Sequence, residues 1–148
     1  MMTDDRDRRI LEVLVENGRK SVVEISNELE IPRATVQERL KRMIETGVIR
    51  KFVAVPDYSK TGKQVTAYVF VTFRNEEGVS QRSLAEAVSR MSGVYEVSVI
   101  SGEWDILAKV RAESVEEIGT MVVDKLRAMK GIEKTETCVA FQTIKERF

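Results

Sequence analysis

Apolar residues recur at helical spacing in the N-terminal part of the chain, and the pattern predicts three short helices. Asp4 is the best N-cap for a first helix over residues 5–17, and Ser21 for a second over residues 22–29. Only two residues separate the second helix from the third, so these helices are expected to cross steeply, as in a helix-turn-helix. Because all three apolar faces need covering, the pattern predicts a small tri-helical core.

The third helix, within residues 31–49, organises this part of the chain. Its apolar stripe consists of Val36, Leu40, Met43 and Ile44. Its opposite face carries Ala34, Thr35, Glu38, Lys41, Arg42 and Glu45. Gly47 follows as a left-handed cap, and residues 50–55 then alternate as a strand does, which predicts a wing. The outer face of this helix is the surface that a winged helix-turn-helix presents to a partner.

The rest of the chain repeats a strand–helix–strand pattern twice. The predicted elements, in that alternating order, cover residues 64–73, 80–91, 95–101, 105–111, 115–129 and 135–144. Each helix ends on a similar motif, at residues 91–94 and 129–132, in which Gly caps the helix and an apolar residue returns to the core. Two such units in series give βαββαβ, a ferredoxin-like sandwich with two helices on one face of four antiparallel strands.

The predicted fold class is therefore α+β, with an N-terminal winged helix-turn-helix followed by a C-terminal ferredoxin-like βαββαβ domain. Pro56 and Asp57 open a turn-forming stretch that marks a hinge between the two. The predicted boundaries are residues 1–55 for the first domain, 56–64 for the linker and 65–148 for the second domain.

Both faces of the predicted sheet carry apolar residues. In its first strand Val69 and Val71 face one way, while Tyr68 and Phe70 face the other. Helices would cover only one face, so a second copy of the same sheet is the simplest cover for the other. We therefore expect a homodimer through the C-terminal half, which would also supply two recognition helices for a pseudo-palindromic DNA site.

Charge is unevenly distributed along a chain whose formal net charge is zero. Residues 33–51 hold six basic side chains against two acidic ones, an excess of +4. A local basic patch is sufficient for phosphate binding, whatever the charge of the whole chain. The alternative for the same residues is a solvated helix face with pairs such as Glu38–Arg42.

The sequence contains no histidine and a single cysteine, Cys138. The missing histidine removes Ser-His and Cys-His nucleophile pairs and makes a Cys/His zinc site impossible, so neither a metal nor a cofactor is expected. No apolar run is long enough to cross a bilayer, and the N-terminus has no signal-peptide core. We expect a cytoplasmic protein with no membrane partner.

Five features, in order along the chain, resemble the Lrp/AsnC family of transcriptional regulators, also called feast/famine regulatory proteins. They are the D-x-x-D-x-x-I-L of residues 4–11, Glu24-Ile25-Ser26 with Leu29, residues 36–40 with Gly47-Val48-Ile49, the turn Gly102-Glu103-Trp104-Asp105, and Thr135-Glu136-Thr137. The resemblance implies that the second half is a RAM domain, which dimerises, assembles further to tetramers or octamers and senses amino acids. Pro32 departs from the Ser usual in the family, and Trp104 from the common Tyr.

The candidate DNA-binding residues are Arg33, Ala34, Thr35, Gln37, Glu38, Arg39, Lys41, Arg42, Arg50 and Lys51. Arg33 and Gln37 lie near the N-terminal end of the recognition helix and suit base edges, since Arg pairs with guanine and Gln with adenine. The remaining basic residues are better suited to phosphates. Arg39 lies beside the apolar stripe, so an internal ion pair with Asp7 or another acid is an equal alternative.

The candidate effector-binding residues are Ser101, Gly102, Trp104, Asp105, Thr135 and Thr137. The resemblance implies a pocket between neighbouring dimers at the turn of residues 102–105, where Asp105 would hold the α-amino group of an amino acid. The alternatives are a plain hairpin at this turn and a regulator without a ligand.

The leading prediction is a sequence-specific, DNA-binding transcriptional regulator, modulated by an amino acid or a related small metabolite. One alternative is a DNA-organising architectural protein of low sequence specificity. A second is an enzyme similar to the siroheme decarboxylases, which share the two-part architecture. Their tetrapyrrole chemistry relies on His and Arg, and this chain has no His, so we expect that the protein is not an enzyme.

Overall fold

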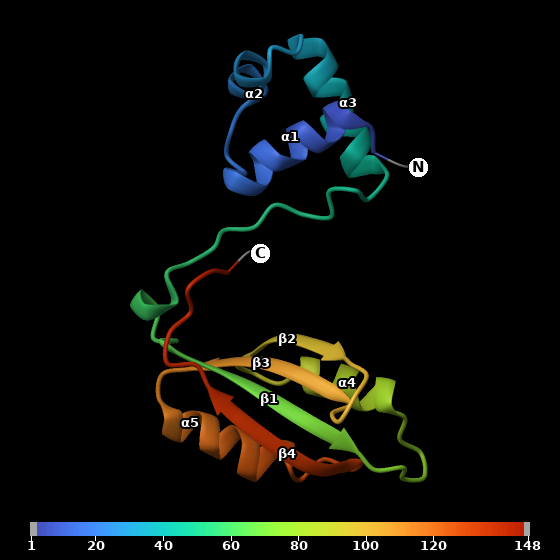
Figure 1. Cartoon of the computed structure of the whole chain (residues 1–148), viewed down its shortest axis with the longest axis vertical. Coiled ribbons are helices and arrows are strands. Elements are labelled where there is room, and N and C mark those ends of the chain that lie inside the picture. The colour runs from blue at the N-terminus through green and yellow to red at the C-terminus, as the bar shows by residue number, and fades with distance from the viewer. Residues whose placement is uncertain (1–2, 147–148) are drawn as a thin grey trace. The chain divides into compact units, whose positions relative to one another are not determined.

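The computed structural model of the protein describes residues 3–146. The chain divides into two compact units, with the division between Val55 and Pro56 (Figure 1). Each unit has its own cluster of buried apolar side chains, so each is described by itself. No helix among the described residues is long and apolar enough to cross a membrane.

Three helices make up the N-terminal unit: α1 (Asp5–Glu16), α2 (Val22–Leu29) and α3 (Arg33–Glu45). Asp4 and Ser21 cap α1 and α2 through reciprocal capping boxes, as the sequence predicts. The buried apolar core consists of Ile10, Val13, Ile25, Ile31, Val36 and Met43. These side chains come from all three helices and the turn between α2 and α3, which confirms the predicted tri-helical core.

The turn between α2 and α3 is fixed by two local features. The Ser26 hydroxyl is buried and donates to the backbone carbonyl of Ile31 over 2.6 Å. Glu30, the C-cap of α2, adopts a left-handed backbone with φ 54°. A residue with a Cβ is strained in this conformation, so the turn carries a local free-energy cost in its backbone.

Two predictions for this unit are wrong. Ile44 is 50% exposed, because α3 packs along Val36 and Met43 and its last turn carries Ile44 away from the core. The strand predicted over residues 50–55 is absent, and Phe52 and Val53 lie mostly exposed there. A strand needs a neighbour for its backbone hydrogen bonds, and the described residues of this unit include no other strand.

The C-terminal unit begins with a short 3-10 helix, Tyr58–Lys60, followed by a four-stranded sheet and its helices. In chain order the elements are β1 (Val65–Phe73), α4 (Gln81–Ser89), β2 (Val94–Val99), β3 (Ile106–Ala112), α5 (Val115–Thr120), a π-helical turn over Met121–Leu126, and β4 (Ile132–Val139). The strand order is β2-β3-β1-β4, with antiparallel neighbours throughout (Figure 1). This is the predicted βαββαβ arrangement.

The last strand differs from its predicted range of 135–144. It begins at Ile132, which pairs with Phe73 directly after the Gly131 turn, and it ends at Val139. Beyond Ala140 the chain has passed the start of β1 and has no strand to pair with. Phe141 and Ile144, predicted as strand residues, are therefore fully or largely exposed.

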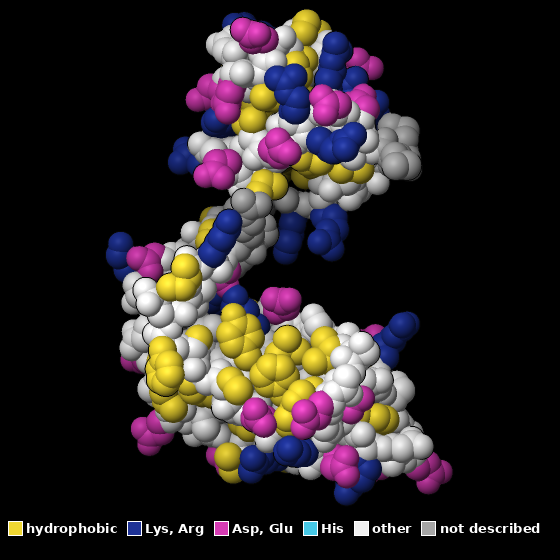
Figure 2. Space-filling view, viewed as in Figure 1, with side chains coloured by type: hydrophobic (Ala, Val, Ile, Leu, Met, Phe, Trp, Pro, Cys, Tyr) yellow, Lys and Arg dark blue, Asp and Glu magenta, His cyan; other side chains and the backbone are white. Residues whose placement is uncertain are grey.

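The two faces of the sheet have different surroundings. Ala67, Val69 and Val71 of β1 are buried in the core that includes residues of α4 and α5. Tyr68 and Phe70, on the opposite face, are only partly buried. Figure 2 shows hydrophobic side chains gathered over the sheet on this open face. The predicted presence of apolar residues on both faces is therefore confirmed.

Candidate nucleic-acid interface and ligand site

The outer face of α3 is polar and accessible. Exposed on it or just beyond it are Arg33, Ala34, Gln37, Glu38, Lys41, Arg50 and Lys51, and Thr35 is half-buried. No side chain among the described residues caps the helix at Pro32. The first N–H groups of an uncapped helix point outward along a positive dipole, which is the arrangement that binds phosphate at helix N-termini.

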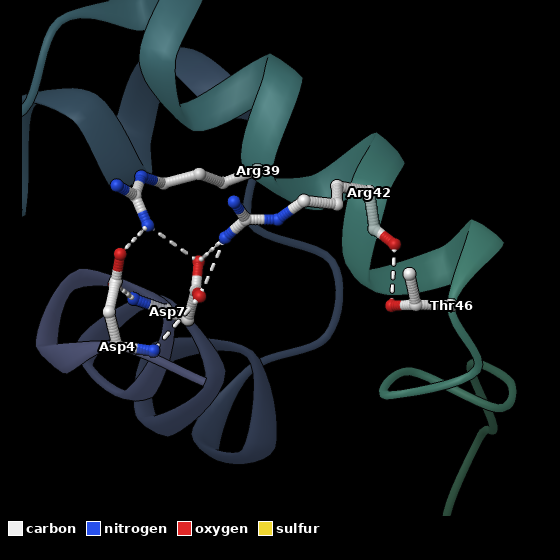
Figure 3. Close-up of polar contacts among 5 residues, drawn as sticks. All are labelled: Asp4, Asp7, Arg39, Arg42 and Thr46. Atoms are coloured by element: carbon white, nitrogen blue, oxygen red, sulfur yellow. Dashed lines mark hydrogen bonds and ion pairs between the residues drawn. The ribbon is translucent and has the colours of Figure 1, made fainter. Parts of the chain in front are cut away.

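Two arginines of α3 turn toward α1 instead (Figure 3). The Arg39 guanidinium donates to Asp4 over 2.6 Å and to Asp7 over 2.8 Å. One nitrogen of Arg42 donates to both carboxylate oxygens of Asp7, over 2.7 and 2.8 Å. We call these four side chains the acidic clasp. Asp7 is its centre and is only 2% exposed.

The clasp holds both of its carboxylates in the charged form. Burial raises the pKa of Asp7, but hydrogen bonds from Arg39 and the Asp4 backbone and the charge of Arg42 outweigh it, so the pKa lies below its ordinary 3.8. The hydrogen bond from Arg39 and a second from the Asp7 backbone lower the pKa of Asp4. The clasp thus remains ionised at neutral pH.

Sequence reasoning found only part of this network. The pair between Arg39 and Asp7, given as the alternative to a DNA contact, is present. The inward turn of Arg42 was not predicted. The available signal was Asp7 itself, because it lies three residues before Ile10 on the apolar stripe of α1. An acid on a buried stripe requires a cationic partner, and a neighbouring helix must supply it.

The turn before β3 holds three of the candidate effector residues. Gly102 has φ 130°, a backbone that favours glycine. Asp105 accepts a hydrogen bond from the Phe73 backbone over 2.7 Å and another from the Gln81 amide over 3.2 Å. Its carboxylate therefore ties this turn to the end of β1 and the start of α4, which the sequence did not reveal.

Trp104 lies against the sheet next to this turn. Its ring is 5.8 Å from that of Phe70, and the ammonium nitrogen of Lys134 is 4.7 Å from the indole centre. Lys134 was not among the predicted site residues, although its position beside Thr135 could have suggested it. The structure thus brings an aromatic surface and a cation together at this end of the sheet.

The other candidate effector residues are less closely associated with this turn. Thr135 accepts a hydrogen bond from the Arg127 side chain over 2.9 Å and lines an open, polar pocket of about 260 Å³. The pocket is lined by Arg127, Ile132, Glu133, Lys134 and Thr135. Thr137 is exposed farther along β4, and Ser101 is exposed before the turn.

Arg111 anchors the linker on the C-terminal unit, a feature that the sequence did not predict. The side chain is nearly buried, and its guanidinium carbon lies 3.8 Å from the ring centre of Tyr58 in the linker. It also donates to Thr66 over 3.2 Å and to Glu146 over 2.5 and 2.6 Å. Burial and the charge of Arg111 lower the pKa of Lys109, which pairs with the same Glu146 carboxylate.

A three-helix unit with an exposed polar third helix, joined to an antiparallel α+β domain, defines a helix-turn-helix protein with a second, ferredoxin-like domain. Residues 3–50 match the family model described as winged helix-turn-helix DNA-binding, and residues 66–148 match that of the Lrp/AsnC ligand binding domain. The chain belongs to the Lrp/AsnC family of transcriptional regulators, as its motifs predicted.

Relatives of similar length support the assignment. An uncharacterized HTH-type transcriptional regulator of Pyrococcus horikoshii is 46% identical over 143 residues, which are 97% of this chain and 95% of the relative. One of Pyrococcus furiosus is 44% identical over 145 residues, covering 98% of this chain and 97% of the relative.

Solved structures share the fold over the whole chain. An AsnC family transcriptional regulator from Agrobacterium tumefaciens has a TM-score of 0.90 and 26% identity, covering 98% of this chain and 94% of that one. The regulator NMB0573 of Neisseria meningitidis, solved as its L-Met complex, has a TM-score of 0.90 and 24% identity, with coverages of 99% and 94%.

Proposed function

We propose that the protein regulates transcription by binding duplex DNA through α3 and the residues that follow it, with Arg33 and Gln37 at base edges and Lys41, Arg50 and Lys51 at phosphates. The main support for this proposal is the outer face of α3, which is exposed, on a helix whose N-terminus has no side-chain cap. A recognition helix enters the major groove by this end. Glu38, Ala34 and Thr35 share that face and would contribute to its shape and base preference.

The active form in this proposal is a homodimer that pairs the open faces of two sheets. The partly buried Tyr68 and Phe70 and the neighbouring Leu107 support it, because an apolar sheet face exposed to water is costly. Two copies related by a two-fold axis would read a pseudo-palindromic operator. Further assembly to tetramers or octamers, and a location in the cytoplasm, belong to the same proposal.

An amino acid is the proposed effector. The match to a ligand binding domain supports this, as does the relative of Neisseria meningitidis solved with L-Met. At the turn before β3, the Lys134 ammonium would pair with the ligand carboxylate, and Trp104 would contact its side chain. Asp105 already accepts two structural hydrogen bonds, but a carboxylate has about four acceptor positions and can also take an α-ammonium group.

Selection of bound DNA from a random pool, with and without a mixture of amino acids, tests the proposal. We expect a palindromic consensus, and a shift in binding when the effector is present. A pool that shows no enrichment would overturn sequence-specific binding. Enrichment without any response to amino acids would leave the DNA-binding proposal intact and overturn the effector.

A DNA-organising protein is the second candidate, favoured by the basic excess around α3. The two candidates differ in the ratio of specific to non-specific affinity, which is typically 10³ or more for a sequence-specific regulator. The relatives found are transcriptional regulators, which favours the main proposal over a decarboxylase-like enzyme.

A further inference from the structure

The basic side chains of the recognition helix α3 differ in their availability to DNA. The Lys41 side chain is 75% exposed, whereas that of Arg42 is 37% exposed and that of Arg39 only 17%. Arg33 is exposed at the start of the helix. The two arginines with low exposure are those of the acidic clasp.

The clasp balances these two positive charges with two negative ones at short range. Asp7 accepts hydrogen bonds from both arginines, and Asp4 accepts one from Arg39, over donor–acceptor distances of 2.6 to 2.8 Å. Hydrogen bonds between charged groups at this distance are among the strongest in proteins. A DNA phosphate would have to compete with a preformed carboxylate for each guanidinium, and in the case of Asp7 with a buried one.

We propose that Asp4 and Asp7 limit the strength of phosphate binding by withholding Arg39 and Arg42 from DNA. Non-specific affinity grows with the number of phosphates that a protein neutralises, whereas sequence preference comes from base contacts such as those of Arg33 and Gln37. Removing two cations from the phosphate-binding set therefore lowers the affinity for every DNA sequence alike and makes binding less dependent on salt. This inference rests on the proposed DNA-binding function.

Asp4→Asn and Asp7→Asn test the inference. Asn caps a helix about as well as Asp, so Asp4→Asn removes the charge and keeps the α1 cap. For each arginine that is freed to contact phosphate, the slope of log Kobs against log salt should steepen by about 0.9. That change means about 3.5-fold more affinity lost between about 50 mM and 200 mM salt. At low salt, the affinity for the selected operator and that for a duplex of random sequence should rise alike.

Asp5→Asn is the matched control, because it makes the same change in net charge one residue away. Asp5 is exposed in the first turn of α1 and takes part in none of the ion pairs found among residues 3–146. We expect its salt slope to equal that of the wild type. In the double variant Asp7→Asn/Arg42→Gln the slope should return toward the wild-type value, because the released cation is gone.

The salt slope separates competition for the arginines from structural support, since a clasp that only stabilises the fold would weaken binding when it is broken. Circular dichroism establishes that each variant is folded. A slope that is unchanged or flatter in both folded Asn variants would overturn the inference, as would equal steepening in Asp5→Asn. A wild-type protein that binds no duplex would instead overturn the proposed function.

Discussion

At the scale of single residues, the decisive feature is a buried carboxylate that joins two helices. Asp7 occupies a position on the apolar stripe of α1, where an uncharged residue is the usual choice. The hydrogen bonds that it accepts from Arg39 and Arg42 offset the free-energy cost of its burial only while it is ionised. The stability of the N-terminal unit is therefore linked to the protonation of this one group.

Acid should destabilise the N-terminal unit through Asp7. Its folded-state pKa lies below the ordinary 3.8, so the stability it contributes is complete above pH 3.8 and is lost as the pH falls through the lower, folded value. We expect the melting temperature of the unit to fall steeply below about pH 4, and less steeply in Asp7→Asn. Thermal melts by circular dichroism from neutral pH downward measure this. Parallel pH profiles for the two proteins would contradict it.

Glu30 offers a stabilising substitution. Glu30→Gly should raise the stability of the N-terminal unit by about 1 kcal/mol, because glycine adopts the left-handed backbone at φ 54° without a steric penalty. Glu12→Gly is the control, since it makes the same chemical change at an exposed, right-handed position in α1 and should cost about 1 kcal/mol. Denaturant midpoints compare the two, and destabilisation by both would contradict the prediction.

At the scale of elements, periodicity and capping residues predicted most of the fold, and pairing decided the rest. The three N-terminal helices and the βαββαβ order follow from local patterns, so the sequence sufficed for them. The alternation at residues 50–55 could not become a strand without a neighbour, and β4 ended where β1 began. All candidate DNA residues except Arg50 and Lys51 could be placed on α3 from its periodicity, whereas the contacts of Arg42, Asp105 and Arg111 depend on segments distant in sequence.

The linker should detach from the C-terminal unit when Tyr58 loses its aromatic ring. Tyr58→Leu removes the aromatic face that lies against Arg111, so residues 56–64 should become more susceptible to limited proteolysis. Tyr58→Phe keeps the ring and should be more resistant than Tyr58→Leu. Cleavage rates of the three folded proteins give the comparison, and equal rates would show that the stacking does not hold the linker.

At the scale of the whole molecule, the two units present different exposed surfaces. The N-terminal unit has a covered core and an exposed polar helix, which suits a partner of opposite charge. The C-terminal unit has an apolar sheet face that its own helices do not cover (Figure 2). Function in this proposal therefore depends on a second copy as well as on DNA, and family membership agrees with that division of roles.

A charge on the open sheet face should prevent dimerisation. Phe70→Glu places a carboxylate where two sheets would meet, so we expect a monomer at concentrations at which the wild type is dimeric. Val123→Glu adds the same charge at a position that is 55% exposed and should leave the dimer intact. Sedimentation velocity distinguishes the species. An unchanged dimer in Phe70→Glu would locate the interface elsewhere.

The most direct test of the central claim, that the start of α3 reads bases while the residues that follow α3 hold phosphates, compares Arg33→Ala with Lys51→Ala. Both residues are exposed, and each substitution removes one positive charge. Equilibrium titrations with the selected operator and with a random duplex, over a range of salt, supply the measurement. We expect Arg33→Ala to cost about 1–3 kcal/mol on the operator and relax base preference, and Lys51→Ala to weaken both duplexes alike and flatten the salt slope by about 1. Unchanged base preference in Arg33→Ala would contradict the claim.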